Sequence, residues 1–227
     1  MAAITMHGAS HPGRVRVRNE DSFRLDPRRG LAVVADGMGG HAGGDVASRL
    51  AADAFVAALS WRVRFGWFRR EALRTAVQAA NHAVYQAASG DAQLRGMGTT
   101  LVAVLCTRRA AHVVHVGDSR AYRLHDDQLE CLTKDHVWPT PEGTPSNVLT
   151  RAIGSDPQVD CDDRIVGLAH GDRLLLCSDG LSRTTDDDEI RAVLRQHPTA
   201  PAAVAALIDG ALAHGAPDNV TVVVVDL

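Results

Sequence analysis

The sequence lacks several features that would assign it to a large class of proteins. No apolar run approaches the ~20 residues that a membrane-spanning helix needs, and residues 1–12 are too polar for a secretory signal peptide. The net charge of −3 provides no basic excess for binding nucleic acid. We therefore expect a cytoplasmic protein that binds neither membranes nor nucleic acids.

Cysteine is scarce and scattered. Cys106, Cys131, Cys161 and Cys177 include no C-x-x-C pair, so the sequence predicts neither a zinc site nor a disulfide framework. No repeat, low-complexity tract or linker divides the 227 residues, of which 45% are hydrophobic and 22% charged. We therefore predict a single domain over residues 1–227.

The spacing of apolar residues favours an α+β fold. Helical spacing and capping patterns predict helices over residues 45–59, 69–88, 185–196 and 201–214. Short β-rich runs predict strands over residues 4–9, 22–25, 31–35, 99–107, 110–116, 121–124, 128–132, 158–166, 173–178 and 220–225. Residues 134–147, rich in Pro, Gly and Thr, are predicted to be a loop. This order of elements indicates helices that cover antiparallel sheets.

Three arginines near the N-terminus alternate with valines. If residues 14–18 are extended, Arg14, Arg16 and Arg18 lie on one side of the segment. The simplest interpretation is a solvated strand edge.

The most informative stretch is residues 31–44. Five apolar residues of strand type lead directly into Asp36, and a glycine-dense turn follows before an Ala-rich helix. An unpaired carboxylate at the end of a buried strand is costly, so something must neutralise it. A helix N-terminus would suffice. Gly37-x-Gly39-x-x-Ala42 also fits a loose dinucleotide fingerprint, but Asp36 would repel a pyrophosphate, which disfavours that alternative.

Asp36 is one of a set of acids that stand at strand edges, flanked by apolar residues. The set comprises Glu20, Asp21, Asp36, Asp118, Asp179 and Asp218. If the strand ends converge, these carboxylates repel one another unless cations lie between them. Oxygen ligands of this kind suit Mg²⁺ or Mn²⁺ better than zinc. Two such cations can activate water and can bind the attacking and the leaving oxygen of a phosphoryl transfer. The residues therefore indicate phosphoester hydrolysis by a metal-bound hydroxide.

Six motifs occur in order along almost the whole chain. They are Arg16-x-x-Asn19-Glu20-Asp21, Asp36-Gly37-Met38-Gly39-Gly40-His41, Gly96-Met97-Gly98-Thr99-Thr100, Gly117-Asp118-Ser119-Arg120, Ser178-Asp179-Gly180-Leu181 and Asp218-Asn219-Val220-Thr221. Together they resemble the motif series of the metal-dependent protein serine/threonine phosphatases (the PPM, or type 2C, family) in its short bacterial form. The resemblance implies a central sandwich of two antiparallel β-sheets flanked by helix pairs, with a dimetal cleft at one end.

The resemblance also implies the metal ligands. Asp36 would bridge two Mn²⁺ or Mg²⁺ ions, and the Gly37 carbonyl would coordinate one of them. Asp179 and Asp218 would hold the first ion. Glu20 would reach the second, through water.

The resemblance also implies roles for four further residues. Asp21 would support Glu20, and Asn219 would be structural. Arg16 would bind the substrate phosphate, which suits its fixed fork of donors. Asp118 would contribute to a third, weaker metal site.

The chain departs from the family pattern in three places. Met38 stands where the eukaryotic branch carries a histidine proposed as general acid, and His41 is a nearby candidate for that role. Arg183 stands where the family commonly has an aspartate of the third site. Its side chain either pairs with Asp118 in the cleft or points to solvent. The segment between residues 136 and 147, where many bacterial members carry a longer flap over the cleft, is short.

The implied activity is hydrolysis of phosphoserine and phosphothreonine in proteins by a hydroxide that bridges two tightly bound Mn²⁺ or Mg²⁺ ions. A third ion is not expected to bind tightly. The implied partners are phosphorylated substrates of a cognate kinase, and the protein is expected to be a monomer. The alternative is a catalytically weak phosphoprotein-binding regulator of the same fold, which the full set of primary carboxylates disfavours. A metal-titrated assay on a small phosphate ester separates the two.

Overall fold

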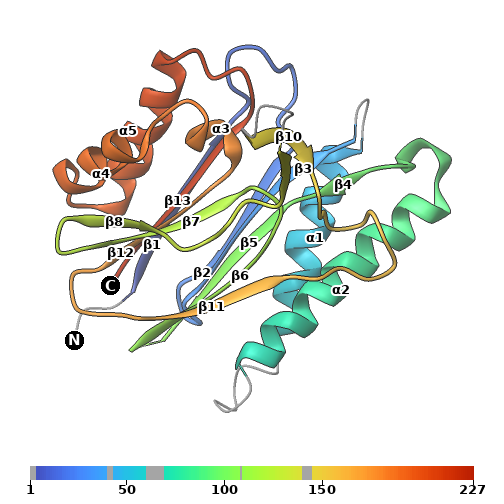
Figure 1. Ribbon diagram of the computed structural model, residues 1–227, viewed down its shortest axis with the longest axis horizontal. Coiled ribbons are helices and arrows are strands. Elements are labelled where there is room, and N and C mark those ends of the chain that lie inside the picture. Colours follow the sequence, from blue (N-terminus) through green and yellow to red (C-terminus); the bar gives the residue numbers. More distant parts are fainter. Residues whose placement is uncertain (1–3, 40–42, 60–68, 108, 140–144) are drawn as a thin grey trace.

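Two antiparallel β-sheets lie face to face between two layers of helices (Figure 1). The computed structural model describes residues 4–39, 43–59, 69–107, 109–139 and 145–227. Among these residues no helix is both long enough and apolar enough to cross a membrane. The arrangement confirms the predicted α+β sandwich.

The first sheet is built around the last strand of the chain. Its strand order is β1 (Thr5–His11), β13 (Val220–Asp226), β12 (Arg173–Cys177), β7 (Arg120–His125) and β8 (Gln128–Cys131). The run from 220 to 225 in β13 is buried throughout, as a nearly continuous apolar strand predicts. β1 extends two residues beyond the predicted end because His11 still pairs with Val220.

The second sheet contains the strand that ends in the Asp36 turn. Its order is β11 (Asp162–Gly167), β6 (Ala110–Val116), β5 (Leu101–Cys106), β3 (Leu31–Met38) and β2 (Asp21–Asp26), and β4 (Gly98–Thr99) pairs with the end of β3. The strand predicted over residues 99–107 is thus interrupted at Thr100. The backbone N–H of Thr100 donates to the Asp36 carbonyl at 2.8 Å.

Helices cover the outer face of each sheet. α1 (Gly44–Leu59) and α2 (Arg69–Gly90) pack on the second sheet, and α3 (Asp179–Ser182), α4 (Asp187–Gln196) and α5 (Ala200–Ala213) pack on the first (Figure 1). A short 3-10 helix, Ala92–Leu94, follows α2. A third apolar cluster fills the space between the sheets. Burying each of its large side chains contributes about 1.5–3 kcal/mol, so the layers hold the cleft end rigidly.

The local structure differs from the sequence predictions at several places. The segment 134–147 contains most of an antiparallel pair, β9 (Val137–Pro139) and β10 (Pro145–Leu149), rather than only loop. The helix α3 was not predicted, because four residues are too few for a periodic pattern. The strand predicted over 158–166 begins only at residue 162, where pairing with β6 starts.

Residues 14–18 do not form the extended edge that their alternation predicted. Arg14 donates through Nε to the Leu212 carbonyl at 2.7 Å, and Arg16 pairs with Asp218 at 2.9 Å. Different partners turn these arginines in different directions, so the segment is a turn that borders the cleft.

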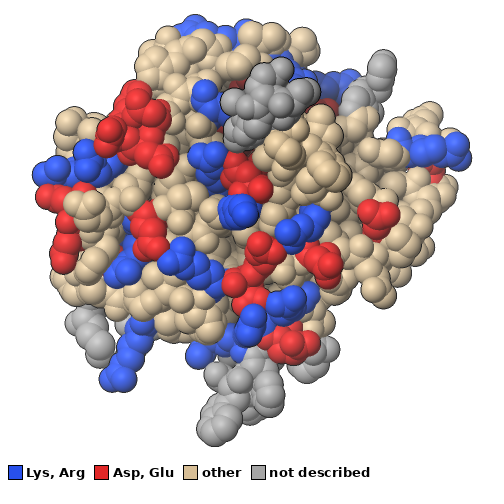
Figure 2. Space-filling model, in the orientation of Figure 1, with Lys and Arg blue, Asp and Glu red and all other residues tan. Residues whose placement is uncertain are grey.

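Charged side chains of both signs are interspersed on the face shown in Figure 2. Many of the basic residues are paired, for example Arg164 with Glu130 at 2.5 Å and Arg151 with Asp162 at 2.7 Å. This pattern agrees with the small net charge. Cys106, Cys131, Cys161 and Cys177 are free thiols.

Candidate metal centre

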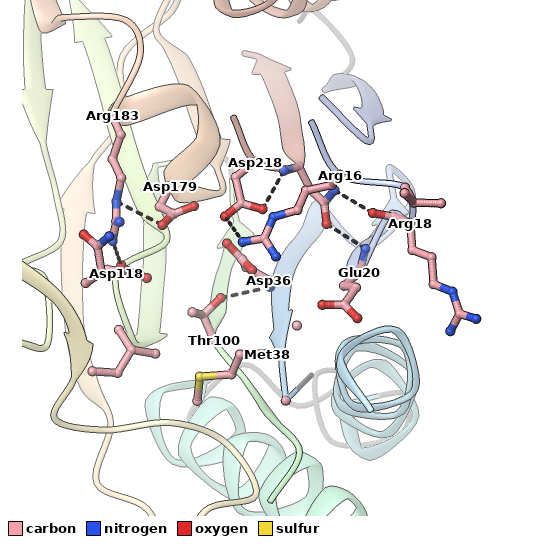
Figure 3. A pocket seen from close by; sticks show the side chains of 16 residues that line it. Arg16, Arg18, Glu20, Asp36, Met38, Thr100, Asp118, Asp179, Arg183 and Asp218 are labelled. Atoms are coloured by element: carbon pink, nitrogen blue, oxygen red, sulfur yellow. Dashed lines mark hydrogen bonds and ion pairs between the residues drawn. The ribbon is translucent and has the colours of Figure 1, made fainter. Parts of the chain in front are cut away.

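A cleft of about 490 Å³ opens at one end of the sandwich, where β3, β6 and β12 end and β2 and β13 begin. Its lining is unusually rich in charged side chains. They are Arg16, Arg18, Glu20, Asp36, Asp118, Asp179, Arg183 and Asp218 (Figure 3). The structure therefore brings together the acids that the sequence places at separate strand edges.

The backbone of Asp36 is clamped by the strand break next to it. Its N–H donates to Thr100 Oγ1 at 3.0 Å, and its carbonyl accepts from the Thr100 N–H at 2.8 Å and from Thr99 Oγ1 at 2.8 Å. Because both backbone groups of Asp36 are held, its carboxylate is fixed at the floor of the cleft.

Two glycines near Asp36 make close contacts, and at Gly37 the contact is with backbone, so only glycine fits there. A Cβ on Gly37 would lie 2.1 Å from the carbonyl oxygen of Gly44, and a Cβ on Gly44 would lie 2.7 Å from the carboxyl carbon of Glu20. The close approach lets the start of α1 pack directly against the turn. The carboxyl group of Glu20 lies against Gly44, and Glu20 lines the cleft.

Asp36, Asp118 and Asp179 have raised carboxyl pKa values. Burial, followed by the charges of neighbouring aspartates, raises the pKa of Asp36 well above its ordinary value. Burial and the charge of Asp118 raise the pKa of Asp179 to about 6. Burial also raises the pKa of Asp118, although the nearby Arg183 opposes that shift. Crowded carboxylates of this kind accept protons readily unless cations stabilise their charge.

Asp21 offers an unused ligand atom next to this group. Its Oδ2 accepts from Thr221 Oγ1 at 2.6 Å and from Ser178 Oγ at 2.7 Å. Its buried Oδ1 has no hydrogen-bond partner among the described residues. A buried acceptor of this kind calls for an ion or a water. The all-oxygen donor set, the raised pKa values and this orphaned oxygen fit divalent Mg²⁺ or Mn²⁺.

Asn219 organises the opposite wall. Its Oδ1 accepts the backbone N–H of Glu20 at 2.8 Å, and its Nδ2 donates to the carbonyls of Pro12 and Arg18 at 3.0 and 2.9 Å. The side chain thus holds the turn that carries Arg16. Arg16 Nη2 donates to Asp218 Oδ2 at 2.9 Å, and its guanidinium lies over the acids (Figure 3).

Arg183 turns into the cleft and contacts two of the acids. Its Nη2 lies 2.7 Å from Asp118 Oδ2, and its Nε lies 3.0 Å from Asp179 Oδ2 (Figure 3). Of the two orientations that the sequence allowed, the structure has the one in which Arg183 pairs with Asp118.

Comparison with known proteins identifies the family. The sequence profile described as protein phosphatase 2C matches residues 7–214. The chain belongs to the protein phosphatase 2C family. The serine/threonine phosphatase Stp of Listeria innocua is 34% identical to this chain, with 94% of this chain and 92% of that protein covered.

Solved structures of other members agree with the fold. The serine/threonine phosphatase PstP of Mycobacterium tuberculosis superposes with a TM-score of 0.89 at 39% identity, covering 99% of this chain and 98% of that one. A structure of the PstP catalytic domain in complex with two manganese ions superposes with a TM-score of 0.88 at 39% identity, covering 98% and 97%. The likeness spans the whole sandwich, including the cleft end.

Most of the predicted site residues lie together in the cleft. Asp21 lies directly behind it, whereas His41 lies outside the described residues. Sequence reasoning missed Ser178 and Thr221, whose hydroxyls donate to Asp21 Oδ2. Both stand inside quoted motifs, next to Asp179 and two residues after Asn219, and that position was the available signal.

Proposed function

We propose that the cleft hydrolyses phosphoserine and phosphothreonine monoesters in proteins with the help of two divalent cations, Mn²⁺ or Mg²⁺. Family membership makes the chain a protein serine/threonine phosphatase. The observation that carries the proposal is the convergence of Asp36, Asp179, Asp218 and Glu20 beneath an arginine.

We assign each of these four acids a role as a metal ligand. Asp36 lies among the others and would contact both ions, with the Gly37 carbonyl on one of them. Asp179 and Asp218 would hold the first ion. Glu20 would reach the second through a water, with Asp21 in support, since its buried Oδ1 has no hydrogen-bond partner among the described residues. When bound, the two cations supply a water activated at neutral pH and neutralise charge on the phosphoryl oxygens.

Arg16 is the proposed phosphate-binding residue. One nitrogen of its guanidinium is engaged by Asp218, and the side chain is 55% exposed, so other donors of the planar fork remain available at the mouth of the cleft. The ion pair with Asp218 orients the guanidinium of Arg16 before the substrate binds. Arg16 would thus hold the phosphoryl group over Asp36.

Arg183 is proposed to replace a third cation. Its guanidinium already neutralises Asp118 and contacts Asp179, so an ion at Asp118 would lose a ligand and meet a like charge. We therefore propose two tightly held ions and no third one at ordinary concentrations. With Met38 in the cleft, the leaving oxygen would take its proton from water or from His41.

The test is a metal-titrated assay of the purified chain on nitrophenyl phosphate and on a phosphothreonine peptide. Hydrolysis of both that requires Mn²⁺ or Mg²⁺ is expected. Binding of the peptide without turnover at any metal concentration would refute the proposal. We further propose a monomeric, cytoplasmic enzyme with one catalytic domain that acts on the products of a protein kinase.

A further inference from the structure

The β9–β10 hairpin borders the cleft and, in the part of the chain that the structure describes, pairs with neither of the two main sheets. Asn147 and Leu149 of this hairpin line the cleft. The two strands form a separate two-stranded sheet. Such a sheet is marginally stable by itself, so its position depends on the contacts at its base.

His136, the residue before β9, supplies those contacts. Its backbone N–H donates to the Gly117 carbonyl at 3.0 Å, and the Gly117 N–H donates to its Nδ1 at 3.1 Å. Its own carbonyl accepts the N–H of Thr150, the residue after β10, at 2.8 Å. One histidine therefore joins both ends of the hairpin to the turn at Gly117.

That turn is part of the cleft wall. Gly117 has a φ of +100°, and a Cβ there would lie 2.6 Å from Thr100 Cγ2, so the turn is tightly held. Asp118 follows it into the cleft. Ser119 Oγ lies 2.7 Å from Thr100 Oγ1, which in turn accepts the Asp36 N–H. Hydrogen bonds at both ends of residues 117–119 thus connect the hairpin, through this short backbone segment, to the floor of the cleft.

The ring of His136 is held in one tautomer. Because Nδ1 accepts the Gly117 N–H, the proton lies on Nε2, which faces Asp162 Oδ2 at 3.4 Å. The ring stacks on His115 with a centroid separation of 4.5 Å. Ligand atoms of His115, His136 and Asp162 lie within 4.8 Å of one another. A metal ion at Nε2 would need the proton on Nδ1, against the Gly117 N–H, so this arrangement fits a structural tie better than a metal site.

We propose that His136 is a positioning residue for substrate recognition, which sets the β9–β10 hairpin against the cleft wall through the hydrogen bond of its Nδ1 with Gly117. The proposal rests on the proposed function. A phosphopeptide must leave the cleft along walls that Val17, Asn147 and Leu149 form, whereas a small ester needs only the charged floor. His136 therefore affects selectivity for peptide over ester.

Matched variants test this role. In His136→Asn the amide oxygen lies near the position of Nδ1, where it can accept the Gly117 N–H. In His136→Gln the amide lies near the position of Nε2, where it cannot accept that N–H. The readout is kcat/KM for a phosphothreonine peptide divided by kcat/KM for nitrophenyl phosphate, both at saturating Mn²⁺. His136→Gln should lower this ratio about tenfold through KM for the peptide, the upper range for one lost hydrogen bond. His136→Asn should stay within about threefold of wild type.

Two further variants keep the proposal open to refutation if His136→Gln folds poorly. Leu149→Ser should lower the same ratio without touching the histidine, and Asp162→Asn should leave it unchanged. Equal losses on both substrates, a His136→Asn as defective as His136→Gln, or an unchanged ratio in Leu149→Ser would each overturn the role of His136. Failure of the wild type to hydrolyse either substrate would instead refute the proposed function, and this role with it.

Discussion

Strand β12 has one aspartate immediately before it and another shortly after it, and these two acids are held in opposite ways. Asp172, at the start, is 1% exposed and is contacted by Arg123 Nη2 at 2.6 Å and His125 Nδ1 at 2.6 Å. Burial raises its pKa, but hydrogen bonds from Ala169, His125 and Arg123 outweigh that effect and lower it overall.

Asp179, at the cleft end, lies among other acids, and burial and Asp118 raise its pKa to about 6. Its cationic contact, Arg183, is shared with Asp118. The same strand thus has a neutralised carboxylate at one end and an incompletely neutralised group at the other. The first stabilises the fold, whereas the second costs stability until cations bind.

The largest expected effect is that of Asp36→Asn. It removes charge from both proposed ion sites at once, so kcat on nitrophenyl phosphate should fall on the order of 10³-fold, or about 4 kcal/mol. The metal-free variant should unfold at a temperature no lower than wild type, since a repelling charge is lost. Retention of most of the metal-dependent activity would contradict the dimetal interpretation.

The opposite end of β12 should respond in the opposite way. Asp172→Asn leaves the guanidinium of Arg123, 15% exposed, without its counter-charge. The free energy of unfolding should fall by about 3 kcal/mol, while kcat per folded molecule stays at the wild-type value. Urea unfolding and active-site-normalised kinetics check this. A large loss of kcat with unchanged stability would be the contrary result.

The two ends should also differ in pH dependence. Burial raises the pKa of Asp21 to about 7, from 3.8 for the ordinary group. A carboxyl group that holds its proton more tightly when folded contributes stability below pH ~4 that is lost as pH rises through about 7. Metal-free Asp21→Asn should therefore gain stability relative to wild type as pH is raised over that range.

Urea unfolding at a series of pH values measures this difference, and Asp172→Asn is the matched control. Because the pKa of Asp172 is lowered, its stabilising effect is lost only as pH falls below ~4, so its difference from wild type should stay constant above that value. A constant difference for Asp21→Asn over the same window would show that its carboxyl group does not titrate there.

The smallest effect concerns Arg183. Wild-type activity should saturate in a single phase as Mn²⁺ is raised, because the guanidinium occupies the place of a third ion. Arg183→Asp should add a second, low-affinity activating phase, and Arg183→Met, which removes the charge without adding a ligand, should not. A wild-type titration that already shows the second phase and loses it in Asp118→Ala would refute this.

The sequence predicted the fold best where a pattern is local. Helical spacing located α1 and α2, and an acid after an apolar run located Asp36 and Asp179. The turn at 14–18 was missed because Asn219, some two hundred residues away in the chain, fixes it through the Pro12 and Arg18 carbonyls. The direction of Arg183 and the position of the β9–β10 hairpin likewise depend on contacts with residues distant in the sequence, Asp118 and Gly117, that no local spacing reveals.

The central claim is that the acids at the cleft end of the sandwich bind two divalent ions and that Asp36 is a ligand of both. The most direct measurement counts Mn²⁺ ions bound per chain, by electron paramagnetic resonance of free Mn²⁺ in an equilibrium titration. We predict two tightly bound ions in the wild type and the loss of both in Asp36→Asn, with two retained in Asp172→Asn. A wild type that binds fewer than two ions, or an Asp36→Asn variant that keeps both, would contradict the account.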